Sequence, residues 1–453
     1  MKSTYLHPSA VCAAIILTCG AVTAQATGWR GDGSGCYPKA APVLNWSKDT
    51  NIVWAAPLAD WSNASPLPVG KRVFVLSEKA ILQCLDLDTG TNLWSRTNDY
   101  SQVMSAEDFA DLRRGEALQG RVVDTARRLQ AEPGNMGLYG QMAEICREVM
   151  ADARNSNAFA VVRQYTLPPT HGLTGYTTPS PVSDGKAVYI LTALGTAARY
   201  DLEGNRAWIR LVRKPTRGWG QSGSPLLADG KLLVHIDDML YALSLETGGT
   251  LWTFKGGSSH GTSAIVKVGE QIHIHTTGGD LVRVSDGVCA ATKVGGTGFN
   301  AAIIDGDTLY AADGAAVAVT LSPGPSNTVA TVKKWSATLK GGRYFASPVL
   351  ADGLLYAINE SGVLCAIDIK DGAAVYDKKL DFGTAYPSLC FAGGRLFASG
   401  DSGITVVIEP GREYKEIARN NLGEGFRSTP CFVGDRILIR AQKKLYCIGT
   451  PGR

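Results

Sequence analysis

Residues 224–252 read SPLLADGKLLVHIDDMLYALSLETGGTLW and contain four short apolar runs separated by turns. The turns fall at residues 229–230, 237–238 and 246–248, and they consist of Asp, Gly, Glu and Thr. Gly and Asp tolerate the backbone angles of tight turns, so this alternation is typical of antiparallel strands joined by hairpins. The stretch therefore predicts a four-stranded meander. One such sheet cannot bury both of its faces without neighbours of the same kind.

The Asp-Gly turn, or a degraded form of it, recurs along the chain. Its glycines are Gly70, Gly185, Gly230, Gly269, Gly306, Gly353, Gly393 and Gly434. From Gly185 onward, successive turns lie 37 to 47 residues apart. A period of about 40–50 residues with four strands per repeat indicates a β-propeller. We therefore predict an all-β fold, an eight-bladed propeller of four-stranded blades.

The two ends of the repeat region complement each other. Residues 429–449 supply three strands of a last blade and stop before a fourth, whereas residues 51–54 (NIVW) form a lone strand near the N-terminus. Pairing the two leaves no open sheet edge at the seam, as a propeller requires. The N-terminal strand is thus expected to close the last blade.

An insertion interrupts the repeat after blade one, because Gly70 and Gly185 are too far apart for adjacent blades. Residues 105–155 are rich in Ala, Arg, Glu and Leu. Val122, Ala126 and Leu129 recur there at helical spacing. This pattern predicts two or three helices inserted at the rim of blade one. They form either part of a binding face or a packing cap over the side of the propeller.

The N-terminus carries the features of an export signal. Lys2 precedes an apolar run at 11–22, and residues 24–26 offer a small-x-small cleavage site. We predict a signal peptide over 1–26 and a mature propeller over 27–453, periplasmic or extracellular. Cys19 leaves a lipid-anchored form as the second alternative. No later segment reaches about 18 apolar residues, so no membrane span is expected.

Composition argues against a nucleic-acid partner. We also expect the protein to be a monomer. The chain has 453 residues and a formal net charge of +4, with no dense Lys/Arg tract. Eight cysteines follow the signal peptide, an even number that permits disulfides in an oxidising compartment. Cys390 and Cys431 share a first-strand position in adjacent blades, where a bridge is conceivable.

The first strand of each blade lines the central channel, so the residues just before it face the channel mouth. Each of these segments offers a ring: Trp61, Tyr176, Trp219, His260, Phe299, Tyr344 or Phe345, Tyr386 and Phe426. These rings either plug the channel and wedge between blades or line a ligand pocket. Arg343 and Arg427 lie beside them and are suited to hold an anionic group.

The sequence shows no motif for catalysis. A nucleophile elbow, a P-loop and a paired-carboxylate motif are all missing. His273 and His275 alternate onto one face of a strand, but no third metal ligand is evident nearby. We therefore predict no catalytic residue and no metal site.

At DLDTGTNLW (86–94), SLETGGTLW (244–252) and SPLLADGK (224–231) the chain resembles the pyrroloquinoline quinone (PQQ)-like β-propeller repeat family. The resemblance covers nearly all of the mature chain except the helical insertion. It implies that the repeated tryptophans lock adjacent blades, in what is called a tryptophan-docking motif.

Two branches of that family imply different functions. The BamB-like non-enzymatic branch implies an exported binding or scaffold module for an envelope protein or a small ligand, with no cofactor. The alternative is a PQQ-dependent oxidoreductase holding PQQ with calcium, in which Trp219 would stack on the quinone. The chain has no adjacent Cys pair of the kind that supports the quinone in many of these enzymes. The non-enzymatic branch is the favoured expectation.

Overall fold

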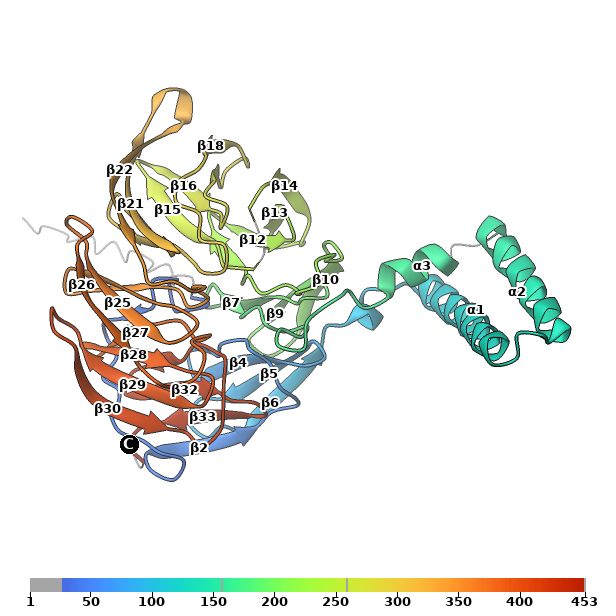
Figure 1. The fold of residues 1–453 in the computed structure, drawn as a ribbon, viewed down its shortest axis with the longest axis horizontal. Helices are drawn as coiled ribbons and strands as arrows, with labels where there is room; N and C mark the ends of the chain where they lie inside the picture. Colours follow the sequence, from blue (N-terminus) through green and yellow to red (C-terminus); the bar gives the residue numbers. More distant parts are fainter. Residues whose placement is uncertain (1–26, 156–157, 258–259, 452–453) are drawn as a thin grey trace, which may run out of the picture.

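The computed structural model describes residues 27–155, 158–257 and 260–451, and the predicted signal peptide lies outside this part. Eight antiparallel sheets follow one another around a ring (Figure 1). Seven of them have four strands, and the seventh blade gains a fifth from the N-terminal segment. The predicted eight-bladed propeller is confirmed.

The blades follow in chain order. Blade one contains β3 (Leu67–Val69), β4 (Arg72–Ser77), β5 (Ile81–Asp86) and β6 (Asn92–Thr97); blade two contains β7 (Val182–Ser183), β8 (Ala187–Leu191), β9 (Thr196–Asp201) and β10 (Arg206–Leu211). Blade three contains β11 (Leu226–Ala228), β12 (Lys231–Ile236), β13 (Met239–Ser244) and β14 (Thr250–Lys255); blade four contains β15 (Ala264–Val268), β16 (Gln271–His275), β17 (Leu281–Arg283) and β18 (Cys289–Ala291).

The second half of the ring repeats this order. Blade five contains β19 (Ile303–Asp305), β20 (Thr308–Asp313), β21 (Ala315–Pro323) and β22 (Val329–Thr338), with a short 3-10 helix at Pro325–Asn327; blade six contains β23 (Val349–Ala351), β24 (Leu354–Ile358), β25 (Val363–Asp368) and β26 (Ala374–Lys379). Blade seven contains β27 (Cys390–Ala392), β28 (Arg395–Ser399), β29 (Ile404–Glu409) and β30 (Lys415–Asn421); blade eight contains β31 (Cys431–Val433), β32 (Arg436–Arg440) and β33 (Lys444–Ile448).

Tryptophans on the outer strands join neighbouring blades. Each donates its indole N–H to a backbone carbonyl of the next blade: Trp54 to Leu87, Trp94 to Leu202, Trp208 to Leu245, Trp252 to Val284 and Trp335 to Ile369. A turn glycine with positive φ lies under each ring. At Gly248, for example, an added Cβ would come within 2.8 Å of Trp208. The tight turn and the close ring together require glycine there.

The N-terminal strand closes the ring as predicted. β2 (Ile52–Pro57) pairs antiparallel with β33, and the register runs from Ile52 opposite Ile448 to Pro57 opposite Lys444. Blade eight therefore combines the two ends of the repeat region, and the seam has no free sheet edge.

The first part of the segment before β2 lies against the innermost strands, which the sequence did not indicate, whereas Ser47 farther along bridges Asn421 of the outer strand β30. β1 (Cys36–Tyr37) pairs in parallel with β27, the innermost strand of blade seven. Arg30 is 2% exposed and donates hydrogen bonds to the carbonyls of Pro348 at 2.6 Å and Leu389 at 3.0 Å. The N-terminal segment thus connects blades six and seven from within.

The helical insertion after blade one is also confirmed, but it continues past residue 155. A 3-10 turn (Tyr100–Gln102) leads into α1 (Ala106–Ala131), α2 (Met136–Asn155) and α3 (Ala158–Tyr165). Figure 1 shows α1 and α2 projecting away from the propeller, so they do not cap its side. No helix in the described ranges is long and apolar enough to cross a bilayer.

The base of the insertion is held by a small apolar cluster. Tyr100, Val161 and Tyr165 pack there with Leu194 of blade two. The hydroxyl of Tyr100 donates to the carbonyl of Leu194 at 2.8 Å. All eight cysteines of the described part are free, so no bridge joins Cys390 to Cys431.

Candidate functional site at the channel mouth

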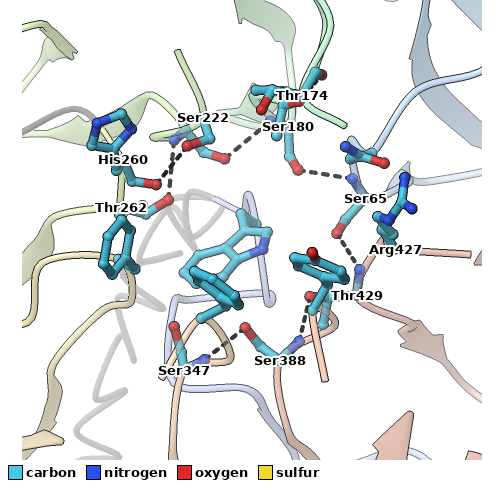
Figure 2. Close-up of a pocket in the computed structure, with 18 of the residues that line it drawn as sticks. Ser65, Thr174, Ser180, Ser222, His260, Thr262, Ser347, Ser388, Arg427 and Thr429 are labelled. Atoms are coloured by element: carbon cyan, nitrogen blue, oxygen red, sulfur yellow. Dashed lines mark hydrogen bonds between the residues drawn. The ribbon is translucent and has the colours of Figure 1, made fainter. Parts of the chain in front are cut away.

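In seven of the eight blades, a Ser or Thr two positions before the innermost strand contacts a neighbouring blade through its side chain. The backbone N–H of one blade donates to a Ser or Thr hydroxyl of the neighbouring blade at 2.9–3.0 Å. The hydroxyl residues are Ser65, Ser180, Ser224, Thr262, Ser347, Ser388 and Thr429, which we call the hydroxyl ring. Figure 2 shows these bonds following one another around the channel from Thr262 through Ser65 to Ser347.

The hydroxyl ring has one gap. Blade five carries Ala301 at the equivalent position. The hydrogen bonds from blade to blade therefore stop at Thr262, which accepts from Ser224, and resume where the N–H of Ala301 donates to Ser347. Ala301 is 3% exposed and supplies no hydroxyl for the backbone of Thr262. Blades four and five are thus joined by one fewer contact of this kind.

Ala301→Ser is expected to complete the ring and raise the free energy of unfolding by about 1 kcal/mol, the usual net value of one hydrogen bond. Urea unfolding measures the change. Ala302→Ser is the matched control, since Ala302 packs in the apolar core between blades four and five. A hydroxyl placed there should lower stability by about 1 kcal/mol or more. Equal effects of the two substitutions on the free energy of unfolding would contradict the interpretation of Ala301 as the gap in the hydroxyl ring.

A second ring of side chains lies two residues before the first. Its members are Asn63, Thr178, Ser222, His260, Phe299, Phe345, Tyr386 and Arg427, and all eight line one pocket at the mouth. The side chains of an extended segment alternate between faces, so positions two residues apart face the same way. The pocket has a volume of about 640 Å³ and includes the hydroxyl ring in its wall.

Aromatic side chains of this second ring form a continuous arch over half of the mouth. Ring centroids lie 5.9 Å apart for His260 and Phe299, 5.4 Å for Phe299 and Phe345, and 5.3 Å for Phe345 and Tyr386. The last pair is stacked, with an interplanar angle of 15°. The guanidinium of Arg427 lies 5.3 Å from the Tyr386 centroid and continues the arch.

The other wall of the mouth comes from the chain that returns from the helical insertion. His171, Leu173 and Thr174 follow α3 and line the pocket. His171 stacks on Trp219 with a centroid distance of 4.5 Å, while the side chain of Trp219 remains 60% exposed. The insertion and the mouth therefore share one part of the surface.

Trp29 lines the pocket from the N-terminal segment. Thr27 pairs with Ser183, and Arg30 binds the carbonyl of Pro348, which directly follows the hydroxyl-ring residue Ser347. These contacts lie farther along the channel than the hydroxyl ring. Trp29 therefore forms the floor of the pocket.

The lining carries positive charge without a matching carboxylate. It includes Arg343 and Arg427, and none of its residues is Asp or Glu. Arg343 is paired with Glu360 outside the pocket at 4.0 Å. Burial lowers the pKa of His260, so this imidazole is neutral at pH 7. The charge facing the pocket comes chiefly from the arginines.

Six of the ten residues proposed from the sequence reach the pocket: Trp219, His260, Phe299, Tyr386, Arg343 and Arg427. Four do not. Tyr344 and Phe426 are 0% and 1% exposed and belong to the core between blades. The wall position belongs to Phe345 rather than Tyr344.

Trp61 and Tyr176 lie behind the pocket wall. An added Cβ at Gly175 would come within 2.7 Å of the Trp61 ring. The N–H of Tyr176 donates to the carboxylate of Glu78 at 2.7 Å, and the ring packs in the cluster at the base of the insertion. Both side chains support the mouth rather than line it.

Comparison with known proteins agrees with the repeat pattern. The profile of a family described as outer membrane protein assembly factor BamB matches residues 40–119, 169–298 and 240–450, which is more than half of the chain. The chain belongs to the BamB family. The BamB profile leaves 120–168 unmatched, and this gap holds most of the helical insertion.

Individual BamB relatives are distant in sequence. A protein from Moranella endobia (strain PCIT) named outer membrane protein assembly factor BamB is 24% identical over 392 residues, covering 84% of this chain and 83% of the relative. The crystal structure of BamB from Moraxella catarrhalis is 12% identical with a TM-score of 0.54, covering 89% of this chain and 98% of that one.

The same fold occurs outside the BamB family. A europium-containing methanol dehydrogenase is 11% identical with a TM-score of 0.58, covering 94% of this chain and 98% of that one. At this level of identity the likeness concerns the fold alone. The function must be argued from the mouth itself.

Proposed function

We propose that this BamB-family chain is an envelope scaffold that binds a protein partner at the channel mouth. The observation that carries this proposal is the exposed Trp219, stacked on His171 at the rim of a pocket of about 640 Å³. Exposed aromatic residues beside a concave, partly apolar surface are typical of binding hot spots. The name of the family supports a role in the cell envelope.

The helical insertion enlarges the proposed interface. Its return segment forms one wall of the mouth and carries the exposed apolar side chains Leu167 at 53% and Leu173 at 39%. A partner seated at the mouth can therefore also contact the insertion.

An oxidoreductase is the alternative, and the lining of the mouth does not favour it. Calcium binds oxygen ligands, among them carboxylates, and the lining contains no Asp or Glu. No group of three or more His, Cys, Asp or Glu residues suited to a metal occurs in the described ranges. A calcium-bound quinone would therefore lack charged ligands at the place where the fold would hold it.

Trp219→Ala is expected to weaken partner binding by about 2 kcal/mol, or about 30-fold, because tryptophan at a rim is a common hot spot. The test is capture of envelope proteins by a photo-crosslinking phenylalanine derivative, which keeps an aromatic ring at position 219. The matched control is Val332, which is 64% exposed on the outer strand of blade five. We expect a specific adduct from position 219 and none from 332.

Titration with PQQ and calcium provides the outcome that would contradict the proposal. A cofactor that binds only the native state raises the melting temperature by mass action. We expect no saturable rise. A rise that is lost in Trp219→Ala, together with no adduct at 219, would replace the scaffold by the oxidoreductase.

A further inference from the structure

The hydroxyl ring presents hydrogen-bond donors to the pocket. A serine or threonine hydroxyl has one hydrogen to donate and two lone pairs to accept. Each of the seven ring oxygens already accepts an N–H from a neighbouring blade. Within the described part of the chain none of these hydroxyls donates to a protein acceptor, so their hydrogens remain available to an acceptor in the pocket.

Arg427 adds a charged donor at the same place. Figure 2 shows its side chain beside Ser65 and Thr429 of the ring. Its contact in the pocket is the face of Tyr386, and its Nε is buried without a hydrogen-bond partner. In the ranges described, Arg427 forms no ion pair, whereas the neighbouring Arg343 is paired with Glu360. A guanidinium without an ion pair, in a lining that contains no Asp or Glu, favours an anionic ligand.

The shape of the pocket indicates what carries the anion. The hydroxyl donors surround the channel, and above them Arg427 continues the arch of Phe299, Phe345 and Tyr386. A single small anion would leave this arch and most of the volume of about 640 Å³ unused. A ligand with a carboxylate beside an apolar or aromatic group would contact both.

We propose that the mouth binds an acidic segment of a partner polypeptide, with a carboxylate held by Arg427 and the hydroxyl ring and an adjacent aromatic side chain against the arch. This inference rests on the proposed function and adds the chemistry of the partner. The carboxylate comes either from an acidic side chain or from a chain terminus.

The test uses four N-acetylated tetrapeptides and isothermal titration calorimetry on the mature protein. Gly-Glu-Phe-Gly amide carries a side-chain carboxylate, and Gly-Gln-Phe-Gly amide is its neutral match. Gly-Gln-Phe-Gly with a free C-terminus carries a terminal carboxylate, and Gly-Lys-Phe-Gly amide reverses the charge. We expect at least one of the two acids to bind about 10-fold or more tighter than the neutral amide, with an affinity that falls as salt is added. The acid that binds identifies the source of the carboxylate.

Arg427→Gln is expected to weaken binding of that acid about 10- to 100-fold, the range for hydrogen bonds to a charged group. Arg412→Gln is the control, since Arg412 is 67% exposed and paired with Asp368 away from the mouth. The Arg412→Gln variant should bind the acidic peptide with unchanged affinity. Equal melting temperatures of the two variants would exclude a loss through misfolding.

Three results would overturn the inference: equal affinity for all four peptides, no effect of Arg427→Gln, or full competition by benzoate alone. The last would assign the pocket to free small carboxylates. A crosslinked partner at position 219 combined with any of these results would leave the scaffold function intact and remove only the acidic segment. Failure of both experiments would remove the two proposals together.

Discussion

Replacing Arg440 with Met is expected to lower the free energy of unfolding by about 4 kcal/mol or more, a large share of the 5–15 kcal/mol that stabilises most domains. Arg440 is 0% exposed on β32 and lies at the seam between blades eight and one. Its guanidinium donates to the carbonyls of Asp60 at 2.6 Å and Ser62 at 2.9 Å. Methionine fills similar volume but leaves these buried carbonyls without a donor.

Further contacts explain why the loss should be large. The same guanidinium donates to the carbonyls of Ala441 and Gln442, both at 2.8 Å, and to the Ser77 hydroxyl at 3.3 Å. Burial lowers the pKa of Arg440 to about 9, so the group is still charged at pH 7. Hydrogen bonds from a charged donor contribute about 1.5–3 kcal/mol each, and lost ones leave polar groups buried and unpaired.

Urea unfolding of the natural protein and of Arg440→Met measures the difference in the free energy of unfolding. Arg440→Lys keeps a charge and three donors, so we expect an intermediate loss from it and a folded protein in any case. Arg412→Met is the control for removing an arginine, because Arg412 lies on the surface. A loss of under about 1 kcal/mol in Arg440→Met would show that the seam depends on strand pairing and not on this guanidinium.

Much of the fold follows from the sequence because a propeller repeats one local pattern. The turn residues and apolar runs of 224–252 recur in blade after blade. Identifying the four strands of one repeat therefore predicts the architecture of the whole propeller. The seam was also predictable, since the last repeat is one strand short and 51–54 supplies it. Both are local patterns, and they need no knowledge of distant contacts.

The lining of the mouth was only partly predictable, because aromatic content alone does not give the direction of a side chain. Counting back from the hydroxyl-ring residue separates the residues two and three positions before it, but not those farther away, such as Trp61, Tyr176 and Trp219. Phe345 lies two positions before Ser347 and faces the pocket, whereas Tyr344 lies three positions before it and faces the core. Phe426 lies three positions before Thr429 and is buried for the same reason.

The contacts of the N-terminal segment could not be predicted by counting positions within a repeat. Trp29 and Arg30 lie in a stretch rich in glycine that has no repeat partner, and Arg30 donates to two carbonyls more than 300 positions away. No periodicity connects Arg30 to the carbonyls of Pro348 and Leu389. Only the closed ring brings these atoms together, so the floor of the pocket became visible only in the structure.

The stability of the propeller is expected to fall steeply between pH 6.5 and about 4 because of two buried histidines. His235 on β12 and His275 on β16 are 5% and 1% exposed. Nε2 of His235 lies 2.9 Å from the carbonyl of Gly256, and Nε2 of His275 lies 2.6 Å from that of Val294. A carbonyl only accepts, so Nε2 carries the hydrogen in both rings.

Burial lowers the pKa of each of these histidines to about 4. In the unfolded chain each has a pKa near 6.5. Between the two values the unfolded state binds a proton that the native state does not, so stability rises with pH and is lost as pH falls. The difference amounts to up to about 3 kcal/mol for each histidine, reached near pH 4.

Glutamine at both positions separates this effect from other acid titrations. Its amide donates a hydrogen bond to the same carbonyl and does not bind a proton in this range. His235→Gln/His275→Gln costs some stability at pH 7.5, which measures the substitution itself. The variant should then lose up to about 6 kcal/mol less than the natural protein on going to pH 4, because the carboxylates titrate alike in both. Parallel curves of unfolding free energy against pH would show that neither imidazole is held neutral by the fold.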